Sequence, residues 1–298
     1  AADGASGSAP WLVYAIPGCF GTSQGPTWSA VGGKPAVVSG GHTGNQSQRL
    51  APGAAVENGG LLGAGMYWQQ GKSYEGSVYV RPAAAGAARL AISATVGGLP
   101  VATAVAEGPW TAGSWQRVPF TLVPNASATC PLSAPSPNHT GTCNDAHALT
   151  GCVDGCVSSP ELGARCVACT GGLRLGVERD STAALDIDQV TVMPGEWGRY
   201  RGLPVRKDLG ELMSHDNPAG MRLSSLRLGG SMVLCDGYRW KKFRGPAEHR
   251  QPYAGVWYRY DSGGWKVFEF LELCEAAGID TCVVTLPVTE TVADLEDL

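Results

Sequence analysis

The stretch that decides the fold is Leu226-Arg-Leu-Gly-Gly-Ser-Met-Val233, and the loop segments Gly237–Lys242 and Gly245–Arg250 follow it. A helical pattern comes next at Phe268–Glu275, and then a β-branched apolar run, Thr281–Leu286. This order of strand, long polar and aromatic loop, helix and strand predicts a βαβ unit of a parallel sheet. In such units, functional residues gather on the loops that leave the carboxyl ends of the strands. We therefore expect the site at the exit of the first strand.

The composition indicates a folded, turn-rich protein. The chain has 298 residues, of which 44% are hydrophobic, and it contains 42 Gly and 20 Pro. This length favours two domains, and the Gly and Pro content favours a β-rich portion with many turns. A net charge of −4 gives no basic surface, so a nucleic-acid partner is not expected. No apolar run is long enough to span a membrane. The absence of an initiator Met and of a signal peptide is what we expect of a processed or excised chain.

Cysteines and glycosylation motifs predict the compartment. Six of the ten cysteines crowd into one Gly-, Ser- and Pro-rich segment: Cys130, Cys143, Cys152, Cys156, Cys166 and Cys169. An even number in such a segment predicts disulfides, and a zinc site built from the last four is the alternative. Asn-x-Ser/Thr motifs at Asn45, Asn125 and Asn138 favour disulfides, because glycosylation occurs in the same compartment. We expect a secreted, extracellular glycoprotein.

Residues 1–195 carry short apolar or alternating runs separated by Gly, Pro and Asn, at the spacing of a β-sandwich. A Cys-rich insertion at about 127–171 precedes the last two expected strands. Pro119 lacks an N–H group, which places its strand at a sheet edge or a bulge. The expected strands are Leu12–Ile16, Pro35–Ser39, Ser47–Leu50, Ser73–Arg81, Ala88–Val96, Gln116–Leu122, Gly172–Glu178 and Leu185–Val192.

Residues 196–298 alternate helical and extended patterns. A helix is expected to begin near Pro204, with an apolar stripe made of Val205, Leu209, Leu212 and Met213, and to end before Pro218. The next strand is expected over Met221–Leu228. A second helix is expected to carry Val267, Phe270, Leu271 and Cys274 inward and to close at Gly278. The run Thr281–Leu286 reads as a strand that is buried on both faces, and another helix starts at Thr289.

The stretch Leu226–Gly278 resembles the start of the catalytic barrel of α-L-arabinofuranosidases, retaining enzymes of glycoside hydrolase family 51 and allied sequences. The resemblance covers 196–298 closely. More loosely, Gly65–Arg81 and Leu185–Met193 are similar to the jelly-roll carbohydrate-binding region that precedes that barrel. The fold class it implies is a jelly-roll β-sandwich followed by the first βα units of a (β/α)8 TIM barrel.

The function that the resemblance implies is hydrolysis of terminal α-L-arabinofuranosyl residues in plant- or algal-type cell-wall polysaccharides: arabinan, arabinoxylan or arabinogalactan. Such enzymes need two carboxyl groups about 5 Å apart. In the family both are Glu residues on later barrel strands, so neither has a counterpart here, and we expect this chain by itself to be inactive. The alternative function is a non-catalytic carbohydrate-binding or extracellular matrix protein.

The resemblance also implies substrate-binding residues. Arg227 matches the sugar-binding Arg of the first barrel strand, and Gly229 and Gly230 match the glycines after it; pairing with a carboxylate is the alternative role of Arg227. Ser231 stands where the commonest form has Asn, and the Pro of the motif is missing. From the residues themselves, Tyr238, Trp240 and Trp257 are expected either to stack on a sugar ring or to pack the loop.

The other reactive groups are interpreted as structural or are given no role. Glu248, Glu269, Glu272 and Glu275 are not assigned catalytic roles. We expect no cofactor, although Asp186 and Asp188 alternate along a strand and are candidates for a structural calcium site. Cys235, Cys274 and Cys282 read as buried thiols, because no paired base is visible.

Overall fold

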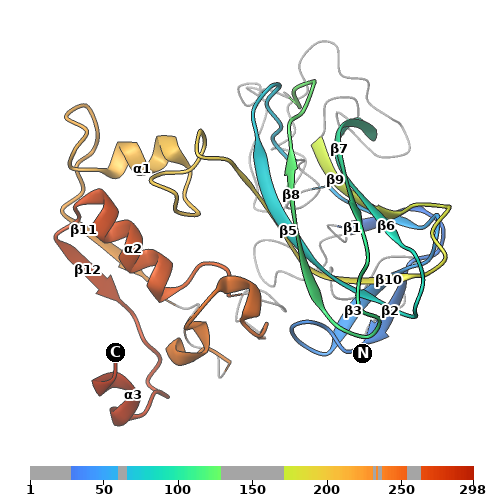
Figure 1. Ribbon diagram of the computed structural model, residues 1–298. Helices are drawn as coiled ribbons and strands as arrows, with labels where there is room; N and C mark the ends of the chain where they lie inside the picture. Colours follow the sequence, from blue (N-terminus) through green and yellow to red (C-terminus); the bar gives the residue numbers. More distant parts are fainter. Residues whose placement is uncertain (1–27, 60–65, 129–170, 231–232, 234–236, 254–262) are drawn as a thin grey trace, which may run out of the picture. The chain divides into compact units, whose positions relative to one another are not determined.

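The computed structural model describes residues 28–59, 66–128, 171–230, 233, 237–253 and 263–298. It divides into two compact units, Ala1–Val192 and Met193–Leu298 (Figure 1). The expected strand Leu12–Ile16 and several candidate residues lie outside the described residues: the six clustered cysteines, Cys235, Asn138, Ser231 and Trp257.

The first unit is built from two five-stranded sheets (Figure 1). One has the order β1-β4-β9-β6-β7, and the other has the order β2-β3-β10-β5-β8. Every pair with an assigned register in these sheets is antiparallel. The strands are β1 Trp28–Gly32, β2 Ala36–Ser39, β3 Gln46–Leu50, β4 Ala55–Asn58, β5 Tyr74–Pro82, β6 Arg89–Val96, β7 Leu99–Glu107, β8 Gln116–Leu122, β9 Gly171–Val177 and β10 Leu185–Pro194.

Period-two patterns correctly predicted most of these strands. β8 coincides with the prediction, and its buried Val118, Phe120 and Leu122 alternate with exposed residues. It ends its sheet, as Pro119 predicted, because a missing N–H is tolerated at an edge. The sequence pattern did not predict β1, β4 and β7. β7 begins Leu-Pro and is otherwise rich in Ala, residues that favour strands weakly, so its pairing with β6 defines it.

An ion cluster around one buried aspartate lies on the second sheet. Asp186 of β10, whose side chain is 1% exposed, accepts from Arg49 Nε at 2.6 Å and from Arg81 Nη2 at 2.9 Å. The Arg81 guanidinium in turn lies 4.6 Å from the centre of the Trp115 ring. Both carboxylate oxygens of Asp186 are therefore engaged by protein cations, which offsets the cost of burying the charge.

The carboxylate of Asp188, two residues along β10, binds the backbone. It accepts from the N–H groups of His42 at 2.7 Å and Thr43 at 3.2 Å. Burial raises the pKa of Asp188, and these hydrogen bonds oppose that rise. Among the described residues, no group of three or more His, Cys, Asp or Glu could hold a metal. A calcium ion at Asp186 and Asp188 stays a prediction.

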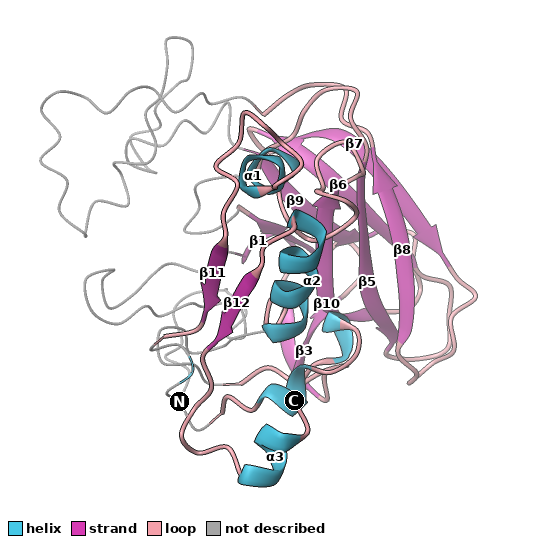
Figure 2. Ribbon diagram, turned by 90° about the vertical axis from the view of Figure 1, so that its left-hand side faces the viewer, coloured by secondary structure: helices cyan, strands magenta, loops and turns pink. Residues whose placement is uncertain are grey.

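The second unit is a small βαβ unit with flanking helices. Its elements are α1 Lys207–Met213, β11 Ser225–Leu228, α2 Val267–Ala277, β12 Thr281–Val284 and α3 Val292–Glu296. β11 and β12 form a parallel pair in which Leu226 lies opposite Cys282 and Leu228 opposite Val284. Figure 2 shows α2 lying along this pair. The buried face of α2 and these four side chains form one hydrophobic cluster.

The end of α2 was predicted well and its inward face less well. Gly278 caps the helix with a φ of 69°, a conformation that costs glycine little. Val267, Phe270 and Cys274 are buried as expected, whereas Leu271 is 39% exposed and Leu273 points inward instead. The helical period sets this outcome, because Leu273 lies three residues after Phe270 and Leu271 lies one after it.

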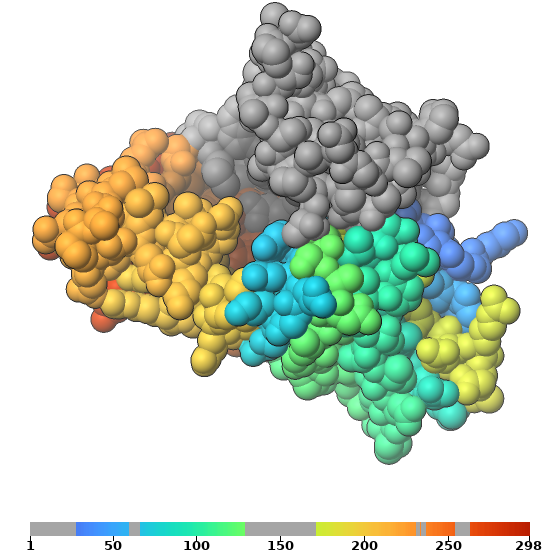
Figure 3. Space-filling model, turned by 90° about the horizontal axis from the view of Figure 1, so that it is seen from above, coloured from blue at the N-terminus to red at the C-terminus, as the bar shows by residue number. Residues whose placement is uncertain are grey.

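The predicted apolar stripe on the first helix was partly wrong. α1 begins at Lys207, three residues after Pro204, and Leu209 and Leu212 are 45% and 41% exposed. Only Val205 and Met213 of the four pack against the cluster that includes Phe270. The segment, yellow to orange in Figure 3, lies at the surface.

The last expected strand is shorter and less buried than the sequence indicated. β12 ends at Val284, and its residues alternate between exposed and half-buried, with Val283 45% exposed. In the described residues, α2 covers one face of the β11–β12 pair. The predicted burial on both faces is therefore wrong for this structure.

A first prediction concerns the ion cluster on β10. Changing Asp186→Asn leaves two guanidinium groups without a charged partner, so we expect the free energy of unfolding to fall by about 2–4 kcal/mol. Asp180→Asn is the matched control, since Asp180 pairs with Arg89 at the surface and is 65% exposed; its loss should cost below about 1 kcal/mol. Urea unfolding of both variants measures the difference, and equal losses would contradict a structural role for Asp186.

Candidate functional site

The site expected from the sequence lies at the carboxyl end of β11. The strand ends at Leu228, whose carbonyl accepts from the N–H of Thr285 at 2.9 Å. Gly229 and Gly230 follow with φ of 116° and 92°, values that side-chain-bearing residues rarely adopt. A Cβ on Gly229 would lie 2.4 Å from Cβ of Thr285. Glycine thus lets the chain turn away directly beside the end of β12.

The structure brings Arg227 and Gly230 together at this end. Arg227 is exposed and alternates with Leu226 and Leu228, the two residues that pack toward α2. A Cβ on Gly230 would lie 3.5 Å from Nη2 of Arg227, so the guanidinium lies close to the glycine. A planar cation beside open backbone is suited to donate hydrogen bonds to the hydroxyl groups of a ligand.

The other aromatic candidates pack the loop. Tyr238 and Trp240 are 3% and 1% exposed, so neither ring offers a free face as placed here. Tyr238 packs with Phe243 at 5.0 Å between ring centres. The Trp240 indole N–H donates to the carbonyl of Asp294 at 3.0 Å, which attaches the loop to α3. A sugar-binding role for these two residues stays a prediction.

A buried ion pair fixes the loop between β11 and α2. Arg250 donates to both carboxylate oxygens of Glu269, at 2.6 and 3.1 Å. The same guanidinium donates to the carbonyls of Gly245 at 2.8 Å and Gly263 at 2.7 Å. Glu269 also accepts from the N–H of Lys266 at 2.8 Å, which caps the start of α2. The Arg250 side chain, which is 4% exposed, therefore connects Gly245, Gly263 and Glu269.

The pKa of Glu269 follows from these contacts. Burial alone raises it, but the hydrogen bonds from Arg250 and Lys266 outweigh burial, so the pKa is lower than usual. Glu269 is therefore a carboxylate at neutral pH. A general acid in glycoside hydrolysis needs the opposite, a raised pKa that keeps its proton.

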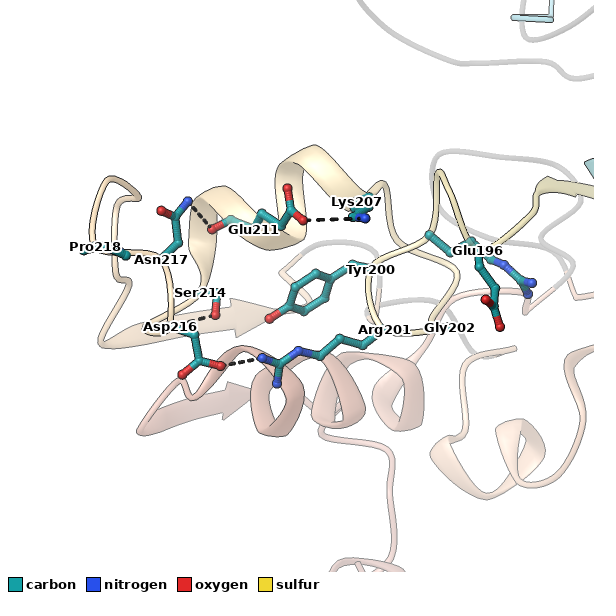
Figure 4. Close-up of a pocket in the computed structure, with 11 residues that line it drawn as sticks. Glu196, Tyr200, Arg201, Gly202, Lys207, Glu211, Ser214, Asp216, Asn217 and Pro218 are labelled. Carbon is teal, nitrogen blue, oxygen red and sulfur yellow. Dashed lines mark hydrogen bonds and ion pairs between the residues drawn. The ribbon is translucent and has the colours of Figure 1, made fainter. Parts of the chain in front are cut away.

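A separate pocket of about 780 Å³ lies in the second unit (Figure 4), lined by Glu196, Arg199, Tyr200, Arg201, Gly202, Lys207, Glu211, Ser214, Asp216, Asn217 and Pro218. Residues in and beside the pocket contact the chain shortly before β11 and β12 begin. Tyr200 and Arg201 donate to the carbonyl of Ala276, and the His215 ring is hydrogen-bonded to the carbonyl of Leu223. The pocket thus lies near the amino ends of β11 and β12, whereas Gly230 follows the carboxyl end of β11.

Charges in this pocket are largely paired. An ion pair joins Arg201 to Asp216, and Lys207 lies 3.9 Å from Glu211 (Figure 4). The Tyr200 ring is 4% exposed and packs in the core, so it cannot stack on a ligand. These contacts favour a structural role for the pocket walls.

Comparison with known proteins finds a family match over the segment that contains β11. The model of the α-L-arabinofuranosidase 1 domain matches residues 218–293, which contain β11, α2 and β12. A curated relative, α-L-arabinofuranosidase 1 of Arabidopsis thaliana, is 32% identical over 110 residues, which cover 35% of this chain and 15% of the relative.

Solved structures give the fold. The arabinose-bound MgGH51 α-L-arabinofuranosidase matches with a TM-score of 0.60 at 14% identity, over 87% of this chain and 37% of that one. A CBM4 structure matches with a TM-score of 0.32 at 12% identity, over 57% of this chain and 95% of that one; this score is too low to carry weight. The chain thus spans well under half the length of the two arabinofuranosidases.

These findings place the chain, by resemblance, among proteins of the glycoside hydrolase type. More particularly, the chain is similar to family 51 α-L-arabinofuranosidases, which confirms the resemblance seen in the sequence. The (β/α)8 barrel expected from it stays a prediction, because the described residues of the second unit hold one parallel strand pair, β11 and β12, with helix α2 packed on it. In the described residues, no helix is long and apolar enough to cross a membrane.

Sequence reasoning missed the residues that hold the loop. Arg250 and Glu269 are separated by nineteen residues, and the sequence placed Glu269 on a helix at the outside of the expected barrel. A signal was present, since Glu at the third position of a helix suits a capping interaction. Its pairing with Arg250 could not be read from spacing.

A second prediction tests the turn after β11. Gly229→Ala introduces both a positive-φ strain of about 1–2 kcal/mol and a clash with Thr285. Gly230→Ala shares the strain, but its Cβ has 3.5 Å of room. We expect Gly229→Ala to lower the unfolding free energy clearly more than Gly230→Ala does, as measured by thermal or urea unfolding. A larger loss from Gly230→Ala would contradict the described turn.

A third prediction concerns pH. Because the pKa of Glu269 is lower in the folded protein, its stabilising contribution is complete above its unfolded pKa of about 4.3. That contribution is lost as the pH falls through the lower folded value. We expect the Glu269→Gln variant to be less stable than the parent at pH 7. We expect its free energy of unfolding to fall less than that of the parent when the pH drops below ~4. Urea midpoints across this range provide the measurement, and parallel profiles would contradict the ion pair.

Proposed function

We propose that this chain forms the sugar-binding start of an α-L-arabinofuranosidase that acts, as part of a longer protein, on terminal α-L-arabinofuranosyl groups of cell-wall polysaccharides. The observation that carries the proposal is the Arg227 guanidinium beside Gly230, at the carboxyl end of β11 and within the matched segment 218–293. The curated relative and the arabinose-bound structure support the sugar by their names.

The chemistry of this edge suits a furanose. Arg227 is permanently charged, and its several N–H donors can bind neighbouring sugar hydroxyls at once. Gly230 has no side chain, so a ring can approach the backbone closely. Ser231 follows in the sequence, and its hydroxyl is the donor or acceptor we assign to a further sugar hydroxyl.

We infer that the two catalytic carboxyl groups come from other parts of the longer protein. Retaining hydrolysis uses one protonated and one ionised carboxyl group about 5 Å apart. Glu269 is held ionised by Arg250, and Glu290 accepts from the N–H of Trp240 at 3.0 Å. Neither is arranged as a proton donor. In this proposal a glycosyl-enzyme intermediate forms on a Glu supplied from elsewhere.

Secretion follows from the same proposal. The substrate lies outside the cell, and two of the glycosylation motifs, at Asn45 and Asn125, have exposed asparagines. We propose that they carry glycans and that the cysteines at 130–169 form disulfides. The comparisons do not favour the alternative of a non-catalytic matrix protein.

The fourth prediction tests the role of Arg227. We expect residues 1–298 to bind an α-L-arabinofuranosyl oligosaccharide in saturation-transfer NMR and to release no arabinose from it. Arg227→Ala should weaken binding about tenfold or more, because a charged donor is lost. Arg222→Ala is the matched control, since Arg222 is an exposed arginine that precedes the strand.

Two outcomes would contradict the proposal. Equal affinity of the Arg227→Ala variant and the parent would remove Arg227 from the sugar site. Arabinose release by the chain alone would show that the catalytic pair lies within it.

A further inference from the structure

Two cysteines of the second unit lie in the same core. Cys274 of α2 is 1% exposed and belongs to the hydrophobic cluster that contains Phe270 and Leu273. Cys282 of β12 is half-buried and packs against that cluster. The helix and the strand thus direct one thiol each into a shared space.

The segment between them is short and ordered. The carbonyl of Cys274 accepts from the N–H of Ile279 at 2.9 Å, and the Cys282 thiol donates to the carbonyl of Ile279 at 3.6 Å. The turn at Gly278 reverses the chain between α2 and β12. Ile279 therefore contacts both cysteines, the backbone of Cys274 through its N–H and the thiol of Cys282 through its carbonyl.

We propose that Cys274 and Cys282 are a disulfide site that ties α2 to β12. Both thiols are free in the structure. Because both side chains pack in one cluster, a disulfide requires a side-chain rotation that brings the sulfur atoms to the bonding distance of about 2 Å. A metal site is disfavoured, since no group of three ligands exists among the described residues. This inference does not depend on the proposed sugar site.

The bond forms by two thiol–disulfide exchanges with a small oxidised thiol such as oxidised glutathione. The Cys282 thiolate, the more accessible one, attacks one sulfur, forms a mixed disulfide and releases one glutathione thiolate. The Cys274 thiolate then attacks Sγ of Cys282 and releases the second. Two electrons pass to the oxidant, and the protons lost by the two cysteines are taken up by the two glutathione thiolates.

The second exchange is slow in the folded protein. Burial, and secondly the neighbouring Cys282 thiol, raise the pKa of Cys274 to about 12, so its thiolate is scarce at neutral pH. We therefore expect the bond to form during folding, before the cluster around Cys274 closes, and to resist reduction afterwards.

The experiment is a disulfide map of the whole chain, refolded with oxidised and reduced glutathione and then alkylated in denaturant. A protease that cuts after Glu separates Leu273–Glu275 from Ala276–Glu290. If the bond forms, these two peptides stay joined until a reductant is added. The refolded parent should also show as many alkylatable thiols as a Cys274→Ser/Cys282→Ser double variant.

Single variants complete the test. With Cys274→Ser, the remaining Cys282 should take up one glutathione as a mixed disulfide, because its partner is missing. The proposal is overturned if both cysteines are alkylated in the refolded parent, or if either is joined to a different cysteine. The parent map decides between these outcomes even where a variant fails to fold.

Discussion

The buried pair between Arg250 and Glu269 is the interaction on which the second unit depends. A long loop joins β11 to α2, and the regular structure in its described residues consists of two short 3-10 helices, Trp240–Phe243 and Ala247–His249. Arg250 adds bonds to two loop carbonyls and to Glu269, which in turn caps α2. The pair therefore fixes the loop and the helix start together, and its removal would leave a charge buried alone.

Aromatic packing adds to this attachment. Phe243 is fully buried among Tyr238 and Tyr253, and the Lys266 ammonium lies 5.6 Å from the centre of its ring. The loop also contacts α3 through Trp240. Tyr238 and Trp240 thus take the packing role that the sequence left open beside sugar stacking, as part of a small core in the described residues.

Sequence patterns predicted the elements that interactions between neighbouring residues determine. Alternation predicted β8, the helical period and Gly278 predicted the end of α2, and the run Leu226–Gly230 predicted the strand and the turn where Arg227 lies. Partners distant in the sequence were not predictable. Nothing in the spacing pairs Asp186 with Arg49, or Arg250 with Glu269, because such pairs form only once strands and loops are folded.

The packing of β11 and the attachment of the loop by Arg250 both bear on the proposed sugar-binding role of Arg227. Its strand is held by pairing with β12 and by packing on α2, and the loop that follows Gly230 is attached by Arg250. A donor on a rigid strand beside a fixed turn loses little entropy when it binds, so its hydrogen bonds contribute more to affinity. A flexible loop would give the same residues weaker discrimination between sugars. Under the proposed function, the interactions that fix the fold thus also set how precisely Arg227 is positioned for a sugar ring.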